Sequence, residues 1–264
     1  MIKKISINTI QTLWLPFTLV AAWWVFSANS EDPFFPPLSV IWDQFVFLWV
    51  FDNVPIHVVP SLINLFSGFS IGVLVGLIGG VIIGTNQGFA RYVEPSVDFI
   101  RSIPPVATVP IFIMIFGLSY EMRVAAIAFS AIFPTMLAVI QGMHSNNPTL
   151  LDTAKVFRLT PIQTLVRVRI PAAAPIIFSG IQVSLQVAFV VTIASELLGS
   201  GFGIGAFTLI ATDTFMITDA WTGVILMGTL GFLVNVVFNV VERRALRWYL
   251  VSKKLSYEVT SVNR

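Results

Sequence analysis

Few residues of this sequence could carry out catalytic chemistry. The chain contains no cysteine, which excludes thiol nucleophiles, disulfides and cysteine-ligated metals. Its two histidines, His57 and His144, have no second histidine or carboxylate at ligand spacing, which argues against a metal site. No Gly-x-x-x-x-Gly-Lys-Ser/Thr loop and no Ser-His-Asp set is recognisable. We therefore predict no catalytic residue, metal or cofactor here, and we expect any nucleotide chemistry to belong to a separate subunit.

The most specific local pattern is found in the segment 142–173. Asn147 followed by Pro148 predicts one helix start, and Thr160 with Gln163 three residues later predicts a second start with a capping box. We expect two short helices with a turn at about residues 158–160, rather than a disordered linker.

One face of the first of these helices suits contact with another surface. Leu150, Ala154 and Phe157 share that face, and the small side chains of Thr153 and Ala154 allow close approach. The face indicates either a docking knob or an ordinary packed loop.

The composition places the chain in a membrane. Its residues are 56% hydrophobic and only 11% charged, and the mean hydropathy is +0.88, so a soluble polar surface cannot be built. A helix needs about 20 apolar residues to cross the hydrocarbon core. The sequence offers six such windows, near residues 9–28, 61–85, 100–118, 123–141, 174–198 and 221–241.

Basic residues alternate with these windows. With the N-terminus inside, fourteen of the fifteen lysines and arginines fall in cytoplasmic segments, and Arg123 is the exception. We therefore predict two cytoplasmic termini, a cytoplasmic segment 142–173, and a first window that is retained rather than cleaved. The fourteen are Lys3, Lys4, Arg91, Arg101, Lys155, Arg158, Arg167, Arg169, Arg243, Arg244, Arg247, Lys253, Lys254 and Arg264.

Two further segments have distinctive patterns. The outer connection 33–60 contains an apolar piece at 40–51 that is too short to span, and we interpret it either as an interfacial helix or as a buried loop helix. Glycine recurs every fourth residue from Gly68 to Gly88, which predicts close packing against a helix of the same chain or of a second copy.

Three residues are candidates for a path through the membrane. Glu196 lies near the end of the fifth window, where a carboxylate is costly unless it faces water, a neighbouring subunit or the interface. Pro104 and Pro105 break the start of the third window, which either opens a binding surface or serves packing alone.

The segment 142–173 resembles the cytoplasmic signature of ABC importer permeases. That signature reads Glu-Ala-Ala, three residues, Gly, nine residues, Ile, one residue, Leu-Pro. This chain matches its register without a gap, through Asp152, Thr153, Ala154, Arg158, Val168, Ile170 and Pro171. Residues 101–106, 110–117, 133–134 and 242–248 look like the nitrate/sulfonate/taurine branch, so the resemblance covers most of 60–250.

The resemblance implies an all-α type I permease fold, with one transmembrane domain over residues 1–264 in a bacterial inner membrane. It implies a second permease copy as a homodimer, two ATPase subunits that bind the ATP, and an extracytoplasmic solute-binding protein, with no nucleic acid. It also implies that the seven matching residues and Phe157 couple the chain to the ATPase subunit.

Arg158 departs from the pattern, because it replaces a glycine at a helix C-terminus. A non-glycine residue there costs about 1–2 kcal/mol if it takes a positive φ. The turn is therefore either built differently or paired with an altered ATPase surface.

Two other kinds of protein remain as alternatives: a stand-alone secondary transporter or channel, and a membrane-embedded enzyme. The first is expected to show internal repeats and charged residues inside its spans, and the second needs a catalytic site. The solute is predicted to be a small anion such as a sulfonate or nitrate, although no cation is expected inside a span. An aromatic, vitamin-like compound is the alternative.

Overall fold

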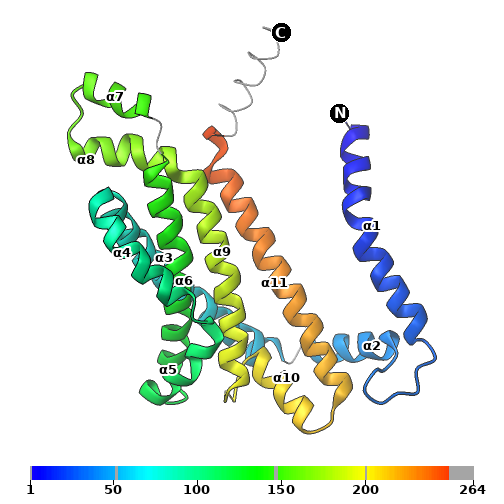
Figure 1. Cartoon of the computed structure of the whole chain (residues 1–264). Helices are drawn as coiled ribbons and strands as arrows, with labels where there is room; N and C mark the ends of the chain where they lie inside the picture. Colours follow the sequence, from blue (N-terminus) through cyan, green and yellow to red (C-terminus); the bar gives the residue numbers. More distant parts are fainter. Residues whose placement is uncertain (1, 51–52, 146–147, 200, 250–264) are drawn as a thin grey trace.

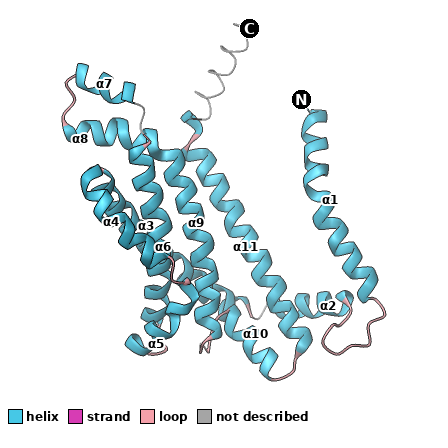
Figure 2. Cartoon of the chain, in the orientation of Figure 1, coloured by secondary structure: helices cyan, strands magenta, loops and turns pink. Residues whose placement is uncertain are grey.

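The chain folds into helices throughout the part that the structure describes. This computed structural model describes residues 2–50, 53–145, 148–199 and 201–249, with side chains from residue 14 onward (Figures 1 and 2). The helices are α1 (Ile2–Ser27), α2 (Leu38–Trp49), α3 (Val59–Gly84), α4 (Gln87–Arg101), α5 (Val109–Phe116), α6 (Tyr120–His144), α7 (Pro148–Val156), α8 (Pro161–Thr164), α9 (Ile170–Leu197), α10 (Ile204–Asp213) and α11 (Ile217–Ala245). Short π turns at Val54–Val58 and Leu165–Arg169 run directly into α3 and α9, and a 3-10 turn at Pro105–Thr108 precedes α5.

Four described helices are long and apolar enough to cross a bilayer. They are Val54–Gly84, Tyr120–His144, Pro161–Leu197 and Ile217–Ala245, and they contain or closely match the predicted spans 61–85, 123–141, 174–198 and 221–241. The predicted span 9–28 falls on α1, which is apolar from Trp14 to Ser27. Four of the predicted spans therefore coincide with helices long enough to cross a bilayer, and the span 9–28 stays a prediction.

The predicted span 100–118 is wrong as a continuous helix. α4 and α5 meet at a bend of 82°, so the pair forms either a broken span or a re-entrant loop. α4 starts at Asn86, whose side chain accepts a hydrogen bond from the Phe89 N–H at 3.2 Å. It ends just before Pro104 and Pro105, because a proline cannot supply the N–H that would continue the helix.

α2 combines the two interpretations of the apolar piece 40–51. Leu38, Ile41 and Trp49 are buried, and the Trp49 Nε1–H donates to Thr222 Oγ1 of α11 at 3.0 Å. Trp42 and Phe47 on its other side are exposed. α2 is therefore half packed and half free to contact lipid.

The glycine stripe is used within the chain. α3 packs along α6, so that a Cβ atom added at Gly68, Gly72 or Gly80 would lie 2.5–2.6 Å from Ile127, Ala128 or Val139. Such distances leave no room for a side chain, so the glycines allow the backbones of two apolar helices to touch. Gly88 does not belong to this stripe, because it lies in α4.

Replacing Gly72 by alanine is expected to destabilise the bundle. The new Cβ would lie 2.5 Å from the Ala128 carbonyl oxygen, and such overpacking costs about 1–3 kcal/mol. Gly79→Ala is the matched control on the same helix, because its Cβ meets only the flexible Met136 Sδ at 3.3 Å. Thermal unfolding in detergent should give a lower Tm for Gly72→Ala alone. Equal Tm values for the two variants would contradict this packing.

Candidate functional site

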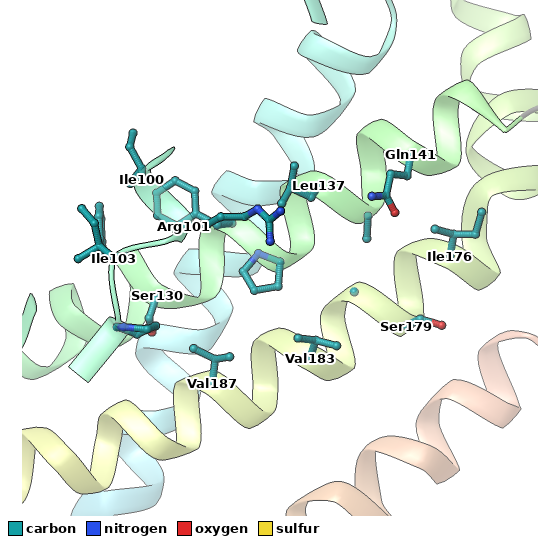
Figure 3. Close-up of a pocket in the computed structure, with 16 residues that line it drawn as sticks. Ile100, Arg101, Ile103, Ser130, Leu137, Gln141, Ile176, Ser179, Val183 and Val187 are labelled. Atoms are coloured by element: carbon teal, nitrogen blue, oxygen red, sulfur yellow. The ribbon is translucent and has the colours of Figure 1, made fainter. Parts of the chain in front are cut away.

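A cavity of about 540 Å³ lies between α4, α6 and α9. Phe129, Phe133 and Leu137 of α6 and Val183 and Val187 of α9 give it largely apolar walls (Figure 3). The cavity therefore has the size and lining of a binding site for a small molecule.

Arg101 brings a positive charge to this cavity from the last residue of α4. In Figure 3 its side chain extends from α4 toward Leu137 of α6. Its Nε–H donates to Asp98 Oδ1 at 2.7 Å, and both side chains are about half exposed. The sequence analysis assigned Arg101 to a cytoplasmic segment, and that assignment stays a prediction; the structure adds that Arg101 lines the cavity.

The two candidate prolines lie at the same break. Pro105 lines the cavity as the first residue of the 3-10 turn, and Pro104 precedes it with a ψ of 122° that ends the helical backbone. The bend at this break turns α5 away from α4, and Arg101 lies at the cavity just before it. A direct contact between either proline and a solute stays a prediction.

Glu196 does not line this cavity. It is fully buried near the end of α9, and its Oε2 accepts a hydrogen bond from the Gly205 N–H at 3.0 Å. The neighbouring Ile204 N–H donates to Ser61 Oγ of α3 at 3.0 Å. Glu196 and Ser61 thus cap the first turn of α10, where a negative charge is also favoured by the helix dipole. Within this chain Glu196 packs between α9, α10 and α3, and its role in the translocation path stays a prediction.

The turn at the end of α7 follows its local sequence closely. Thr160 Oγ1 accepts from the Gln163 N–H at 3.3 Å and Gln163 Oε1 accepts from the Thr160 N–H at 3.0 Å, which confirms the predicted capping box. The predicted cap at Asn147 lies outside the described residues. The second predicted helix is not a separate short one, because α8 continues through the π turn into α9.

Arg158 adopts the backbone that its family position requires. Its φ is +51°, and the Leu159 N–H reaches back to the Ala154 carbonyl at 3.0 Å. The Arg158 N–H donates to the Lys155 carbonyl at 2.9 Å, which completes the glycine-type helix terminus. The turn is therefore built in the usual way, at a cost of about 1–2 kcal/mol for the left-handed arginine.

Two residues of the predicted face, Leu150 and Phe157, are exposed, and Ala154 is not. Ala154 is only 3% exposed, so it packs within the chain and is not available to a partner. The side chains that do project are Val156 at 80%, Phe157 at 74% and Ile162 at 75% exposure, and we call these three the apolar turn residues. Asp152 and Thr153 are exposed, whereas Val168, Ile170 and Pro171 are half-buried at the start of the α9 region. α7 and α8 extend beyond the bundle, at the same end as the start of α1 and the end of α11 (Figure 1).

Comparison with known proteins gives one consistent family. Residues 68–247 match the family described as binding-protein-dependent transport system inner membrane component. A Bacillus subtilis chain described as an aliphatic sulfonates transport permease is 29% identical over 73% of this chain and 70% of its own. The bicarbonate transport system permease of Synechococcus elongatus is 29% identical over 72% of this chain and 68% of its own. The nitrate import permease of a Synechocystis strain is 24% identical over 82% of each chain.

Solved structures give the same fold. A chain of the methionine ABC transporter MetNI in an inward-facing conformation superposes with a TM-score of 0.63 at 20% identity, over 71% of this chain and 94% of that one. The all-helical architecture is therefore that of a type I permease. Because the family match covers more than half of the residues, the chain belongs to the family of binding-protein-dependent transport system inner membrane components and is a membrane-spanning permease subunit.

Proposed function

We propose that this permease forms, as a homodimer, the translocation path of an ATP-driven importer for small oxyanions. The chain itself holds no cofactor in this proposal. Two ATPase subunits bind the ATP, and an extracytoplasmic binding protein delivers the solute.

The apolar turn residues carry the proposal. Val156, Phe157 and Ile162 project from a turn that extends beyond the helix bundle, as Figure 1 makes visible for α7 and α8. Exposed apolar side chains at such a position mark a protein contact, since burying each one in a partner contributes about 1.5–3 kcal/mol. Together with Asp152, Thr153, Arg158, Val168, Ile170 and Pro171 they form the proposed ATPase contact, which Ala154 supports from inside.

The proposed orientation places this turn and both termini in the cytoplasm. The start of α1, the end of α11 and the turn lie at one end of the molecule (Figure 1). That end carries Lys155, Arg158, Arg167 and Arg169, as the positive-inside rule requires of a cytoplasmic face.

A second copy is proposed to complete the path. α5, which follows the cavity-lining Pro105, exposes Ile111, Met114 and Ile115. These side chains give a second permease an apolar surface against which to close the cavity.

The proposed solute class follows from the named relatives and the cavity. Sulfonates, bicarbonate and nitrate, which those relatives are named for, are all small oxyanions. The cavity is large enough for any of them, and Arg101 supplies a cation.

Reconstitution tests this function. The permease, purified with its associated subunits, should bring an ATPase with it and take up ethanesulfonate, nitrate or bicarbonate into liposomes only when ATP and the binding protein are present. The permease alone should transport nothing. Uptake by the permease alone without ATP would instead identify a stand-alone transporter or channel.

A further inference from the structure

We propose that Arg101 is the oxyanion-binding residue of the cavity, and that Asp98 sets its orientation and limits its affinity. This inference rests on the proposed function, because it assumes that the solute passes through this cavity. It adds the residue that selects the charge of the solute.

The guanidinium group of Arg101 has a free side that suits an oxyanion. Asp98 accepts a hydrogen bond from the Arg101 Nε–H only. Among the residues that the structure describes, the two terminal guanidinium nitrogens have no recorded protein partner. A planar guanidinium binds two oxygens of a sulfonate, carboxylate or nitrate group side by side. In Figure 3 this end of the side chain points toward Leu137, at the cavity wall.

The cavity walls around Arg101 are largely apolar. Phe133, Pro134 and Val183 line the cavity together with Arg101. The Arg101 side chain is itself 54% exposed, so an anion that enters the cavity can reach it.

Asp98 keeps the site from holding an anion too tightly. Its carboxylate neutralises part of the Arg101 charge at 2.7 Å and competes with the solute for the guanidinium. It also lines, with Glu94 and Arg101, an adjoining cavity of about 250 Å³. A transport site must bind strongly enough to admit the solute and weakly enough to release it.

The absence of cysteine allows a direct test on the full chain. Val183→Cys places one thiol on the α9 wall of the cavity, at an exposed position. Its rates of modification by anionic sulfonatoethyl methanethiosulfonate and by cationic trimethylammonioethyl methanethiosulfonate are read from the intact mass. Adding Arg101→Gln should lower the anionic-to-cationic rate ratio about tenfold, as expected for loss of one nearby charge.

Two matched variants identify the source of this preference. Arg91→Gln removes an equal charge from an exposed position of the same helix outside the cavity, and it should leave the ratio within about twofold, because distant exposed charges are screened. Asp98→Asn should raise the ratio several-fold. Equal losses in Arg101→Gln and Arg91→Gln, or a cationic preference in the parent, would overturn the proposal.

A substitute cysteine variant and a protection experiment cover the remaining outcomes. If Val183→Cys fails to fold, Ser179→Cys provides a nearly isosteric thiol on the same wall; reaction of neither thiol with either reagent would overturn the proposal. Ethanesulfonate should slow the anionic reagent in the Arg101 protein. Protection by phosphatidylglycerol alone would assign Arg101 to a lipid headgroup and overturn the solute site. The reaction needs neither ATP nor a partner, so its failure is distinct from a failed uptake experiment.

Discussion

Aspartate at both Phe157 and Ile162 is expected to detach the ATPase subunit and to abolish ATP-dependent uptake while the permease stays folded. Both side chains are exposed, so the folded chain does not depend on them. Losing two buried apolar contacts in the complex removes about 4 kcal/mol. That energy corresponds to roughly thousandfold weaker binding. The measurements are the amount of ATPase that co-purifies and the uptake by reconstituted liposomes.

Tyr92→Asp provides the control for this experiment. Tyr92 is 84% exposed on α4 and lies outside the apolar turn residues, so the same charge is added without touching them. It should leave ATPase binding unchanged. Full ATPase binding by the Phe157→Asp, Ile162→Asp variant would show that the partner docks elsewhere.

Glu196→Ala is expected to unfold the region around α10 and lower the yield of folded protein sharply. The substitution leaves the buried Gly205 N–H without its acceptor and empties the space of a fully buried side chain. Together these losses cost about 3–5 kcal/mol. Fluorescence-detected size exclusion with a temperature ramp measures the loss as a lower Tm.

Conservative and exposed replacements separate this packing role from a transport role. Glu196→Gln keeps an oxygen acceptor for Gly205 and should lose only about 1 kcal/mol, the typical value of a charge at a helix N-terminus. Uptake by that variant should persist. Glu31→Ala removes an exposed carboxylate outside any helix and should change nothing. Loss of uptake in a stable Glu196→Gln protein would return Glu196 to the transport path.

Local sequence rules predicted those features that depend on neighbouring residues. Hydropathy located α3, α6, α9 and α11, because a bilayer demands long apolar helices whatever their partners. The capping box of Thr160 and Gln163 could also be predicted, because its two hydrogen bonds join residues only three apart in the sequence. The four-residue spacing of Gly72 and the other α3 glycines predicted a close contact with another helix. It did not predict that this helix is α6.

The broken span shows where hydropathy is insufficient. α4 carries Arg91, Glu94, Asp98 and Arg101, so its average hydropathy resembles that of a surface helix. Only together with α5, across the 82° bend, is it apolar enough for a broken span or a re-entrant loop. The predicted window at 100–118 therefore included the last two residues of α4 and the whole of α5.

Long-range contacts decided the candidate site. Arg101 faces a cavity because α6 and α9 supply the other walls, and no local pattern around Arg101 indicates them. Ala154 shares a helical face with Phe157 by spacing, yet the rest of the chain covers it. Glu196 accepts a hydrogen bond from the Gly205 N–H through Oε2, a contact with α10 that no local pattern around Glu196 indicates.

The uninterrupted run from Pro161 to Leu197 has a mechanical consequence. It contains α8, the π turn Leu165–Arg169 and the whole of α9, and α8 runs at a steep angle to α9 (Figure 1). The 28 residues of α9 rise by 1.5 Å each, so α9 is about 42 Å long. Ile162 precedes α9, Val183 lies along it at the cavity wall, and Glu196 lies near its far end. If the apolar turn residues dock as proposed, one unbroken backbone joins the motor contact to the cavity wall and to the base of α10.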